Sequence, residues 1–413
     1  MVVSLSDRLD RIKPSPSIAA RAIVDRLREQ GTTIYDFTFG EPDLPTPQHI
    51  IDAAKDALDR QETKYTSSLG TLALRRAIAT KLERDNGLAY DPSEIVVGTG
   101  GKHIIYHALM ATLNPGDEVV VPTPYWVSYP DIVALADARS VFVTVSEDNG
   151  FKVTPEDVEA AITTRTKWLV LNTPGNPTGA VYTMEEMRGI LDVLRRHPHV
   201  RLLSDEVYEH YIFDDAKHVS PAFVAPDLKD RILIVNGASK GYCMTGWRIG
   251  FGAGSKDLVA AIGKLITQTT TCASAISQAA AVAAFEGTQT IVQSYAPIFQ
   301  KRRDLMVALL NGAEGISCVP PKGAFFVFAS VAGMIGKRTP DGRILADDLD
   351  VTNYLLEEAG VAVVHGDAYG QSPYIRFSFA TSEDVIREGC LKVQEACRRL
   401  SGTAAAAASG AGT

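Results

Sequence analysis

A chain of 413 residues, in which 46% of the side chains are hydrophobic and 22% are charged, has the size and composition of a globular protein with about two domains. The formal net charge of −8 at pH 7 argues against a surface for nucleic acid or for an anionic membrane, although it leaves room for a local basic pocket. The chain contains no apolar stretch long enough to span a membrane, and its N-terminus lacks the basic-then-apolar pattern of a signal segment.

The N-terminal part of the chain is predicted to be helical. A proline-punctuated arm at residues 13–16 precedes a helical pattern that begins at Ser17 and ends at Gly31, a usual position for a C-terminal glycine. Further helical patterns cover residues 47–60 and 70–85.

Short apolar runs follow, and helical stretches separate them. The runs lie at residues 118–121, 168–171, 200–203 and 232–235. Runs of this kind that alternate with helices predict a mostly parallel sheet with helices on both faces. The last three runs end in polar residues, and open α/β sheets bind ligands at the carboxyl ends of their strands. These strand ends therefore predict one common ligand site.

The composition changes near residue 313. Apolar runs at 323–328, 361–364 and 374–377 predict a second sheet that is antiparallel-leaning and has helices around it. The expected fold class is α/β: a large domain with a mostly parallel sheet sandwiched by helices, plus a smaller α+β domain. The predicted parts are an N-terminal arm with part of the small domain (1–46), the large cofactor-binding domain (47–312), the small C-terminal domain (313–400) and a disordered tail (401–413).

The cysteines predict a reducing compartment. They are odd in number and scattered without CxxC spacing, at Cys243, Cys272, Cys318, Cys390 and Cys397. This pattern predicts free thiols and no metal site, and the histidines show no HExxH pattern either. We therefore expect a cytoplasmic protein.

Lys240 is the most informative residue, because it closely follows the strand predicted at 232–235. Desolvation near a buried strand favours the neutral amine, which is a nucleophile toward aldehydes. Arg248, eight residues later, supplies a cation that can hold a phosphate. Pyridoxal phosphate is an aldehyde cofactor that carries a phosphate. The ordinary alternative is a surface lysine on a loop.

A glycine-rich turn at residues 98–101 follows the apolar run 95–97 and opens a helix. Free backbone amides and the helix dipole at such a turn suit a phosphate. The turn superficially resembles a dinucleotide-binding fingerprint, but His103 stands where that fingerprint requires glycine. We therefore set aside a dehydrogenase of the Rossmann type.

Other candidates each have an ordinary structural alternative. Asn176, in a rigid loop rich in proline and glycine, offers its amide to a ligand or belongs to a surface turn. Asp205 needs a cationic partner, such as a protonated pyridine nitrogen, or is a helix N-cap. Trp126 stacks on a ligand or packs in the core. Arg376 interrupts an apolar alternation, so it is paired or faces a carboxylate.

The order of these residues along the chain is characteristic. The chain resembles the fold-type-I pyridoxal-phosphate aminotransferases of class I and II over roughly residues 4–400, with the greatest likeness to the bacterial aspartate aminotransferase subgroup. The likeness rests on motifs at residues 40–43 (Gly-Glu-Pro-Asp), 64–66 (Lys-Tyr-Thr), 100–102 (Gly-Gly-Lys), 124–129 (Pro-Tyr-Trp-Val-Ser-Tyr), 176–179 (Asn-Pro-Thr-Gly), 204–210 (Ser-Asp-Glu-Val-Tyr-Glu-His), 244–250 (Met-Thr-Gly-Trp-Arg-Ile-Gly) and 380–383 (Ala-Thr-Ser-Glu).

The resemblance implies pyridoxal 5′-phosphate as the cofactor. Lys240 would bind its aldehyde covalently and then move the proton between the substrate Cα and the cofactor, and Asp205 would pair with the ring nitrogen. Tyr208 would bind the ring hydroxyl, and Trp126 would stack on the ring. These four residues are the implied catalytic set. The implied cofactor-binding residues are Lys240, Gly100, Gly101, Lys102, Trp126, Asn176, Asp205, Tyr208, Ser239, Arg248 and Tyr65.

The resemblance also implies how the substrate is bound. Arg376, with Asn176 and the Gly40 backbone, would bind the α-carboxylate, and Lys102 would bind a distal carboxylate. Lys13 on the N-terminal arm would matter for prephenate. The implied substrate-binding residues are Gly40, Trp126, Asn176, Arg376, Lys102 and Lys13. The protein would be a homodimer in which Tyr65 reaches the phosphate of the partner subunit.

Departures from the subgroup pattern lie at the rim of the expected pocket. His103 stands where the subgroup usually has glutamine, and Cys243 replaces a smaller residue near Lys240. The loop at residues 66–70 lacks the commoner proline. These differences put the substrate in doubt and leave the cofactor chemistry intact.

The expected activity is a ping-pong transfer of an amino group between an L-amino acid, with aspartate as first choice, and a 2-oxo acid, with 2-oxoglutarate as first choice. The alternatives are an aminotransferase for aromatic, prephenate-like or specialised substrates, a lyase or oxidase of the same fold, and a cofactor-binding regulator. No helix-turn-helix extension or basic domain supports the last. The resemblance also predicts cis peptide bonds at Thr123–Pro124 and Asn176–Pro177.

Overall fold

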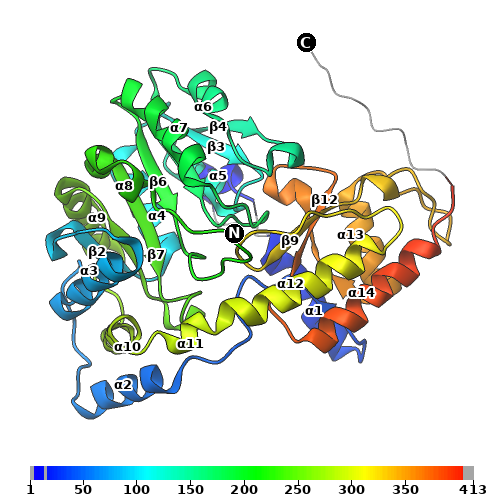
Figure 1. Ribbon diagram of the computed structural model, residues 1–413, viewed down its shortest axis with the longest axis horizontal. Helices are drawn as coiled ribbons and strands as arrows, with labels where there is room; N and C mark the ends of the chain where they lie inside the picture. Colours follow the sequence, from blue (N-terminus) through cyan, green and yellow to red (C-terminus); the bar gives the residue numbers. More distant parts are fainter. Residues whose placement is uncertain (1–3, 14–15, 403–413) are drawn as a thin grey trace.

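The computed structural model describes residues 4–13 and 16–402, and a seven-stranded sheet forms the centre of its larger part (Figure 1). The strand order is β2-β8-β7-β6-β5-β3-β4. Neighbours from β4 to β7 run parallel, and β8 lies antiparallel between β2 and β7. The mostly parallel sheet is thus confirmed. The strands are β2 (Ile95–Gly98), β3 (Glu118–Thr123), β4 (Arg139–Thr144), β5 (Thr166–Asn172), β6 (Arg201–Asp205), β7 (Ile232–Gly237) and β8 (Gly250–Ala253).

Helices cover both faces of this sheet, because its central strands are apolar on both sides. In β5, Leu169 and Leu171 pack into one core, and Trp168 and Val170 pack into the core on the opposite face. The first core is covered by α2 (Gln48–Asp59), α3 (Leu72–Asn86), α6 (Pro155–Ala161), α7 (Met184–Arg196), α8 (Pro221–Val224) and α10 (Ala275–Glu286). The second is covered by α4 (Gly101–Thr112), α5 (Ser128–Leu135) and α9 (Lys256–Thr269).

A second, antiparallel sheet has the order β11-β12-β9 and its own core, which confirms the antiparallel-leaning prediction. Its strands are β9 (Phe326–Ser330), β11 (Val364–His365) and β12 (Tyr374–Ser378), and a parallel pair joins β1 (Tyr35–Asp36) to β10 (Val361–Ala362). The run 361–364, predicted as one strand, is split at Val363 because its halves pair with different strands. The helices nearby are α1 (Pro16–Glu29), α12 (Tyr295–Asn311), α13 (Asp348–Ala359) and α14 (Glu383–Arg398), whereas α11 (Thr290–Gln293) buries Val292 in the first core of the large sheet.

The helices predicted at 47–60 and 70–85 are confirmed as α2 and α3. The division into domains at residues 46, 312 and 400 stays a prediction. Ser401, placed in the disordered tail, instead exchanges backbone hydrogen bonds with Arg338, and residues 403–413 lie outside the described residues. Within the described ranges, no helix has the length and apolar character needed to cross a membrane.

The parallel strands end at one edge of the large sheet, and the loops after β3 and β5 begin there. Both peptide bonds predicted to be cis, Thr123–Pro124 and Asn176–Pro177, are cis, as are Thr173–Pro174 and Ser372–Pro373. Residues 124–127 and 173–183, which follow β3 and β5, form neither helix nor strand, and their side chains are available to build a site.

The packing of the central strands generates a stability prediction. Leu203 of β6 is fully buried, so Leu203→Ala removes apolar contacts and leaves a cavity, which we expect to lower the free energy of unfolding by about 2–5 kcal/mol. Urea unfolding followed by circular dichroism measures the change. Leu391→Ala, at a position 47% exposed on α14, is the matched control and should change it little. Equal effects of the two substitutions would contradict the buried position of β6.

Candidate functional site

A pocket of about 580 Å³ opens at the carboxyl edge of the large sheet. Strand ends supply Asn172 from β5 and Asp205 from β6, and Lys240 comes from the loop after β7. The segment 38–41 and Arg376 of β12 form the opposite wall. Of the residues predicted from the sequence, the pocket brings together Gly40, Gly101, Lys102, Trp126, Asn176, Asp205, Tyr208, Ser239, Lys240, Arg248 and Arg376.

Three predicted residues do not line this pocket. Gly100 stands just behind the pocket wall as the N-cap of α4. Tyr65 is 87% exposed, on the surface of its own chain. The backbone amide of Lys13 lies 3.4 Å from Asp131 Oδ1 on α5, so the arm contacts a helix beside the pocket.

Lys240 lies in the pocket with its amine held by a backbone carbonyl. Its Nζ donates a hydrogen bond to the carbonyl of Gly40, and its own carbonyl accepts from the Tyr211 hydroxyl at 3.0 Å. Burial lowers the pKa of Lys240 to about 8; the Glu41 carboxylate opposes this shift and the Arg248 guanidinium adds to it. The neutral, nucleophilic amine is therefore accessible near neutral pH.

Asp205 is a buried carboxylate at the end of β6. Its Oδ2 accepts a hydrogen bond from the Tyr129 hydroxyl at 2.7 Å. Burial raises the pKa of Asp205 to about 6, and the Tyr129 hydrogen bond opposes that rise. The alternative of a helix N-cap is wrong, because residues 206–210 form turns and no helix begins there. A buried carboxylate facing a pocket suits a cationic ligand atom.

The start of α4 forms an anion-binding corner with Arg248. Gly100 has φ +100°, and a Cβ there would come within 2.5 Å of Arg248 Nη2. A Cβ at Gly250 would lie 2.3 Å from the backbone of Gly100 and Gly101, so glycine allows this close approach. Arg248 donates to the carbonyls of Thr245 (2.8 Å) and Thr99 (3.2 Å). Helix amides and a guanidinium at one corner suit a phosphate.

Arg376 presents its guanidinium from β12 and is 3% exposed. It donates to Asn176 Oδ1 at 3.1 Å and to the Thr38 carbonyl at 2.7 Å, while its buried Nε has no hydrogen-bond partner among the described residues. The Oδ1 atom of Asn172 in turn accepts a hydrogen bond from the backbone N–H of Asn176 at 2.7 Å. This arrangement fixes a planar fork that suits a carboxylate.

Aromatic side chains complete the walls. Trp126 packs edge-on against Tyr129, with ring centroids 5.2 Å apart, and the Lys102 ammonium lies 4.9 Å from the Trp126 ring. Desolvation lowers the pKa of Lys102, Arg248 adds to the lowering, and Asp131 opposes it. Burial raises the pKa of Tyr208, so its hydroxyl stays protonated.

The sequence reasoning assigned no role to several pocket residues. Glu41 accepts a hydrogen bond from Thr245 Oγ1 at 2.6 Å beside Lys240, although both residues stood in quoted motifs. Tyr129 does not line the pocket itself but contacts Asp205 from behind its wall, and it stood in the quoted motif at residues 124–129. Asn172 is the last residue of β5, and its position as a polar residue at a strand end could have identified it as a site residue. Asp25 of α1 is another lining residue, and no sequence pattern pointed to it.

Comparisons with known proteins agree on one family. The family model for aminotransferase class I and II matches residues 32–393. An aspartate/prephenate aminotransferase of Cereibacter sphaeroides is 50% identical over 397 residues, which cover 96% of this chain and 99% of that protein. An aspartate aminotransferase of Rhizobium meliloti is 47% identical over 396 residues, 96% of this chain and 97% of that protein.

Solved structures agree as well. The crystal structure of the aspartate aminotransferase from Rhizobium meliloti matches with a TM-score of 0.94 and 46% identity, over 97% of this chain and all of that one. The aspartate aminotransferase from Thermus thermophilus with maleate matches with a TM-score of 0.89 and 38% identity, over 96% of this chain and all of that one.

The depressed pKa of Lys240 generates a prediction for the protein without any ligand. Because the neutral amine is the nucleophile, labelling of Lys240 by an amine-specific reagent should rise with a midpoint near pH 8 instead of the ordinary value of 10.5. Glu41→Gln removes a carboxylate that opposes the shift, so it should move the midpoint lower still. Brief labelling across a pH series, read by peptide mapping, measures both. A labelling curve that coincides with that of Lys392, which is 50% exposed on α14, would contradict the prediction.

Proposed function

The chain belongs to the class I and II aminotransferases, which depend on pyridoxal 5′-phosphate, and from this membership we propose that it transfers the amino group of aspartate to a 2-oxo acid, with 2-oxoglutarate as the acceptor. The observation that carries the proposal is the convergence of Lys240, Asp205 and Arg376 on one pocket. They supply an accessible amine, a buried carboxylate and a guanidinium, the three groups that such a reaction needs.

The pocket residues fit this cofactor. The start of α4 and Arg248 would hold its phosphate, and Asp205 would face its ring nitrogen. Trp126 would cover the ring, and Tyr208 with Asn176 would bind the ring hydroxyl. When bound, pyridoxal phosphate draws electrons from the substrate Cα and makes the proton there acidic.

Lys240 would hold and move that proton. Its pKa of about 8 lets the amine accept a proton from the substrate Cα near neutral pH and return it afterwards. The Gly40 carbonyl orients the amine toward the pocket. Asp205, with a pKa of about 6, is ionised above that pH, and the Tyr129 hydroxyl stabilises the anion.

Substrate recognition would use the two ends of the pocket. Arg376, braced by Asn176 and the Thr38 carbonyl, would bind the α-carboxylate and so aim the Cα proton at Lys240. Lys102, whose ammonium lies 4.9 Å from the centre of the Trp126 ring, would bind a second carboxylate. Relatives named for aspartate support this choice.

A second candidate is amino transfer to prephenate, alone or beside aspartate. It is favoured by the name of the Cereibacter sphaeroides relative, aspartate/prephenate aminotransferase. Lys13 on the arm beside α5 would then contribute to binding.

We also propose a homodimer with shared active sites. Tyr65 is exposed and outside the pocket of its own chain, so it is free to complete the phosphate corner of a second copy. All five cysteines, being free, support a reducing location, and we place the enzyme in the cytoplasm.

Lys240→Ala tests the proposed function directly. The variant should fold and still bind pyridoxal phosphate through the phosphate corner, but transamination of aspartate should fall by at least about a thousandfold because no amine remains to move the Cα proton. Cofactor absorbance and a coupled assay with 2-oxoglutarate measure the two properties. Turnover by the variant near the wild-type rate would contradict the assignment of Lys240 as the residue that moves the Cα proton.

Lys102→Ala tests the substrate. A charge-assisted contact contributes roughly 1.5–3 kcal/mol, so kcat/KM for aspartate should fall about ten- to a hundredfold, with a much smaller change for a neutral or aromatic amino acid. Lys392→Ala on α14 is the control and should change neither. If the wild type ignores aspartate, or if both substrates lose equally, the acidic-substrate proposal fails and the prephenate or aromatic candidate replaces it.

A further inference from the structure

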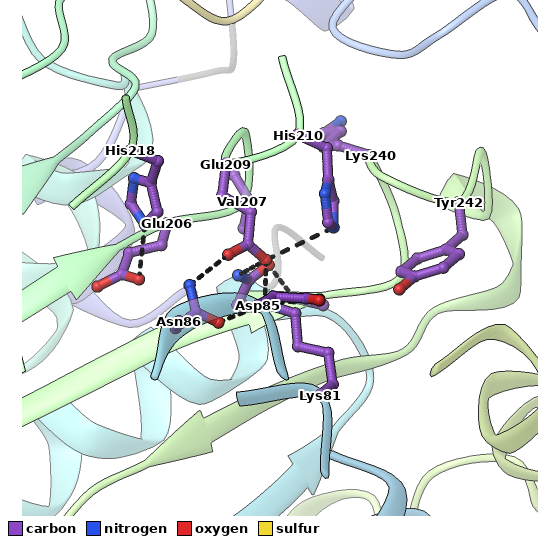
Figure 2. A network of polar contacts seen from close by, with 12 residues as sticks. Lys81, Asp85, Asn86, Glu206, Val207, Glu209, His210, His218, Lys240 and Tyr242 are labelled. Carbon is purple, nitrogen blue, oxygen red and sulfur yellow. Dashed lines mark hydrogen bonds and ion pairs between the residues drawn. The ribbon is translucent and has the colours of Figure 1, made fainter. Parts of the chain in front are cut away.

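A network of buried charged and amide side chains lies behind the pocket, next to Lys240 (Figure 2). At its centre is Glu209, whose side chain is 5% exposed, paired with Lys81 of α3, whose side chain is 1% exposed. Neither residue lines the pocket, and the mechanism above uses neither. A buried charge pair this close to a catalytic amine therefore needs its own explanation.

The Glu209 carboxylate joins separate parts of the chain. Its Oε1 accepts from Lys81 Nζ and from Asn236 Nδ2, the latter at 2.6 Å, and its Oε2 accepts from Asn86 Nδ2 at 2.7 Å. His210 Nε2 lies 3.6 Å from Oε1. The hydrogen-bond donors come from α3 and from the end of β7, and Glu209 itself belongs to the turn after β6, so one carboxylate links three segments.

Two of these segments carry the principal groups of the pocket. Glu209 directly follows Tyr208 and stands four residues after Asp205. Asn236 stands four residues before Lys240, and its Oδ1 accepts from the Gly237 amide at 2.7 Å, which fixes the start of the lysine loop.

His210 extends the connection to the residue after the lysine. Its ring lies so close to Gly241 that a Cβ there would come within 2.2 Å of His210 Cδ2. The loop that carries Lys240 therefore rests on the same network from both sides of the lysine.

The physical value of such a network is orientation more than stability. A buried ion pair often holds a fold no better than apolar side chains of the same volume, because desolvation of the charges offsets their attraction. Hydrogen bonds to a charged carboxylate, however, are short and directional. Such hydrogen bonds fix the relative orientation of two irregular loops more precisely than apolar contacts do, because apolar contacts are not directional.

We propose that Glu209 is a positioning residue for the transamination proposed above, on which this inference rests. Its carboxylate ties the turn that bears Asp205 and the loop that bears Lys240 to α3. The two groups that would flank the cofactor thereby keep a set separation.

The same region contains a cluster with metal-ligand chemistry, formed by Glu206, Glu209 and His218, whose ligand atoms lie within 4.8 Å of one another. Glu206 already accepts from His218 Nε2 at 3.0 Å and from the Ser204 and Ser220 hydroxyls, both at 2.8 Å. With the Glu209 oxygens also engaged, these hydrogen bonds account for the positions of the side chains, and the cluster carries no proposal.

The test separates positioning from stability with three variants. Glu209→Gln removes the nearer carboxylate partner of the buried Lys81, leaving Asp85 Oδ2 at 3.9 Å, and should lower the Tm by about 5–10 °C. Glu209→Leu combined with Lys81→Met removes both charges and should recover part of that loss. Asp214→Asn is the matched control, because it likewise removes one of two carboxylate partners of a buried cation outside the pocket: Arg303 pairs with Asp214 at 2.8 Å and with Asp304 at 2.7 Å.

The decisive readouts concern bound cofactor and not turnover. We measure how fast pyridoxal phosphate absorbance is lost on dilution, and the pH midpoint of that absorbance. The groups that face Lys240, namely Glu41, Asp205, Tyr208, Arg248 and Arg376, are unchanged in every variant. The double variant removes one negative and one positive charge together, so its net charge is unchanged, and a displaced midpoint in that variant reports movement of Lys240 relative to these groups.

We expect the double variant to lose cofactor at least about tenfold faster than wild type, with a midpoint displaced by about half a pH unit or more, despite its recovered Tm. Asp214→Asn should lower the Tm and leave both cofactor readouts unchanged. The inference would be overturned if the double variant had the wild-type rate of cofactor loss and the wild-type pH midpoint. It would also be overturned if Asp214→Asn displaced the midpoint by the same amount as the double variant. A wild type that binds the cofactor without transferring amino groups would contradict the proposed function alone. The rate of cofactor loss and the pH midpoint can still be compared among the variants in that case, because neither measurement requires turnover.

Discussion

The need to keep two ionisable groups out of water, the Asp205 carboxylate and the Lys240 amine, governs the rest of the pocket. Burial pushes both toward their neutral forms, raising the pKa of Asp205 to about 6 and lowering that of Lys240 to about 8. The Tyr129 hydroxyl and the Glu41 carboxylate each oppose one of these shifts. Near neutral pH the carboxylate therefore stays mostly charged, while a substantial minor fraction of the amine is neutral. The same desolvation that is costly for folding makes the amine a usable base.

The pocket also concentrates positive charge in an acidic protein. Lys102, Arg248 and Arg376 line one cavity, and the first turn of α4 adds its backbone amides, although the chain carries a net charge of −8. Anion binding depends on the local field and on directed donors, and both decline steeply with distance in water. An acidic exterior is therefore compatible with a site that holds a phosphate at one corner and a carboxylate at another.

Contacts between segments far apart in the chain hold these groups in place. Arg376 donates to the Thr38 carbonyl, 338 residues away, and to Asn176, 200 residues away. Lys240 and Gly40 are also 200 residues apart. Each partner belongs to a short irregular segment, and the sheet brings the segments together at one edge. The buried network around Glu209, behind the pocket, also joins distant segments: it connects the ends of β6 and β7 to α3.

The sequence by itself determined the parallel sheet, the helices α2 and α3, and the family, because apolar runs and helical patterns are local and the motifs around Lys240 and Asn176 are specific. Polar side chains at the strand ends predicted one common site, because they share one edge of a parallel sheet, and the family resemblance nominated most of the residues that line it. Only the tertiary structure decided that Asp205 meets the Tyr129 hydroxyl and does not cap a helix, that Glu41 faces Lys240, and that the run 361–364 divides between two sheets. Those outcomes depend on burial and on hydrogen bonds between distant segments, and neither leaves a periodic signal in the chain.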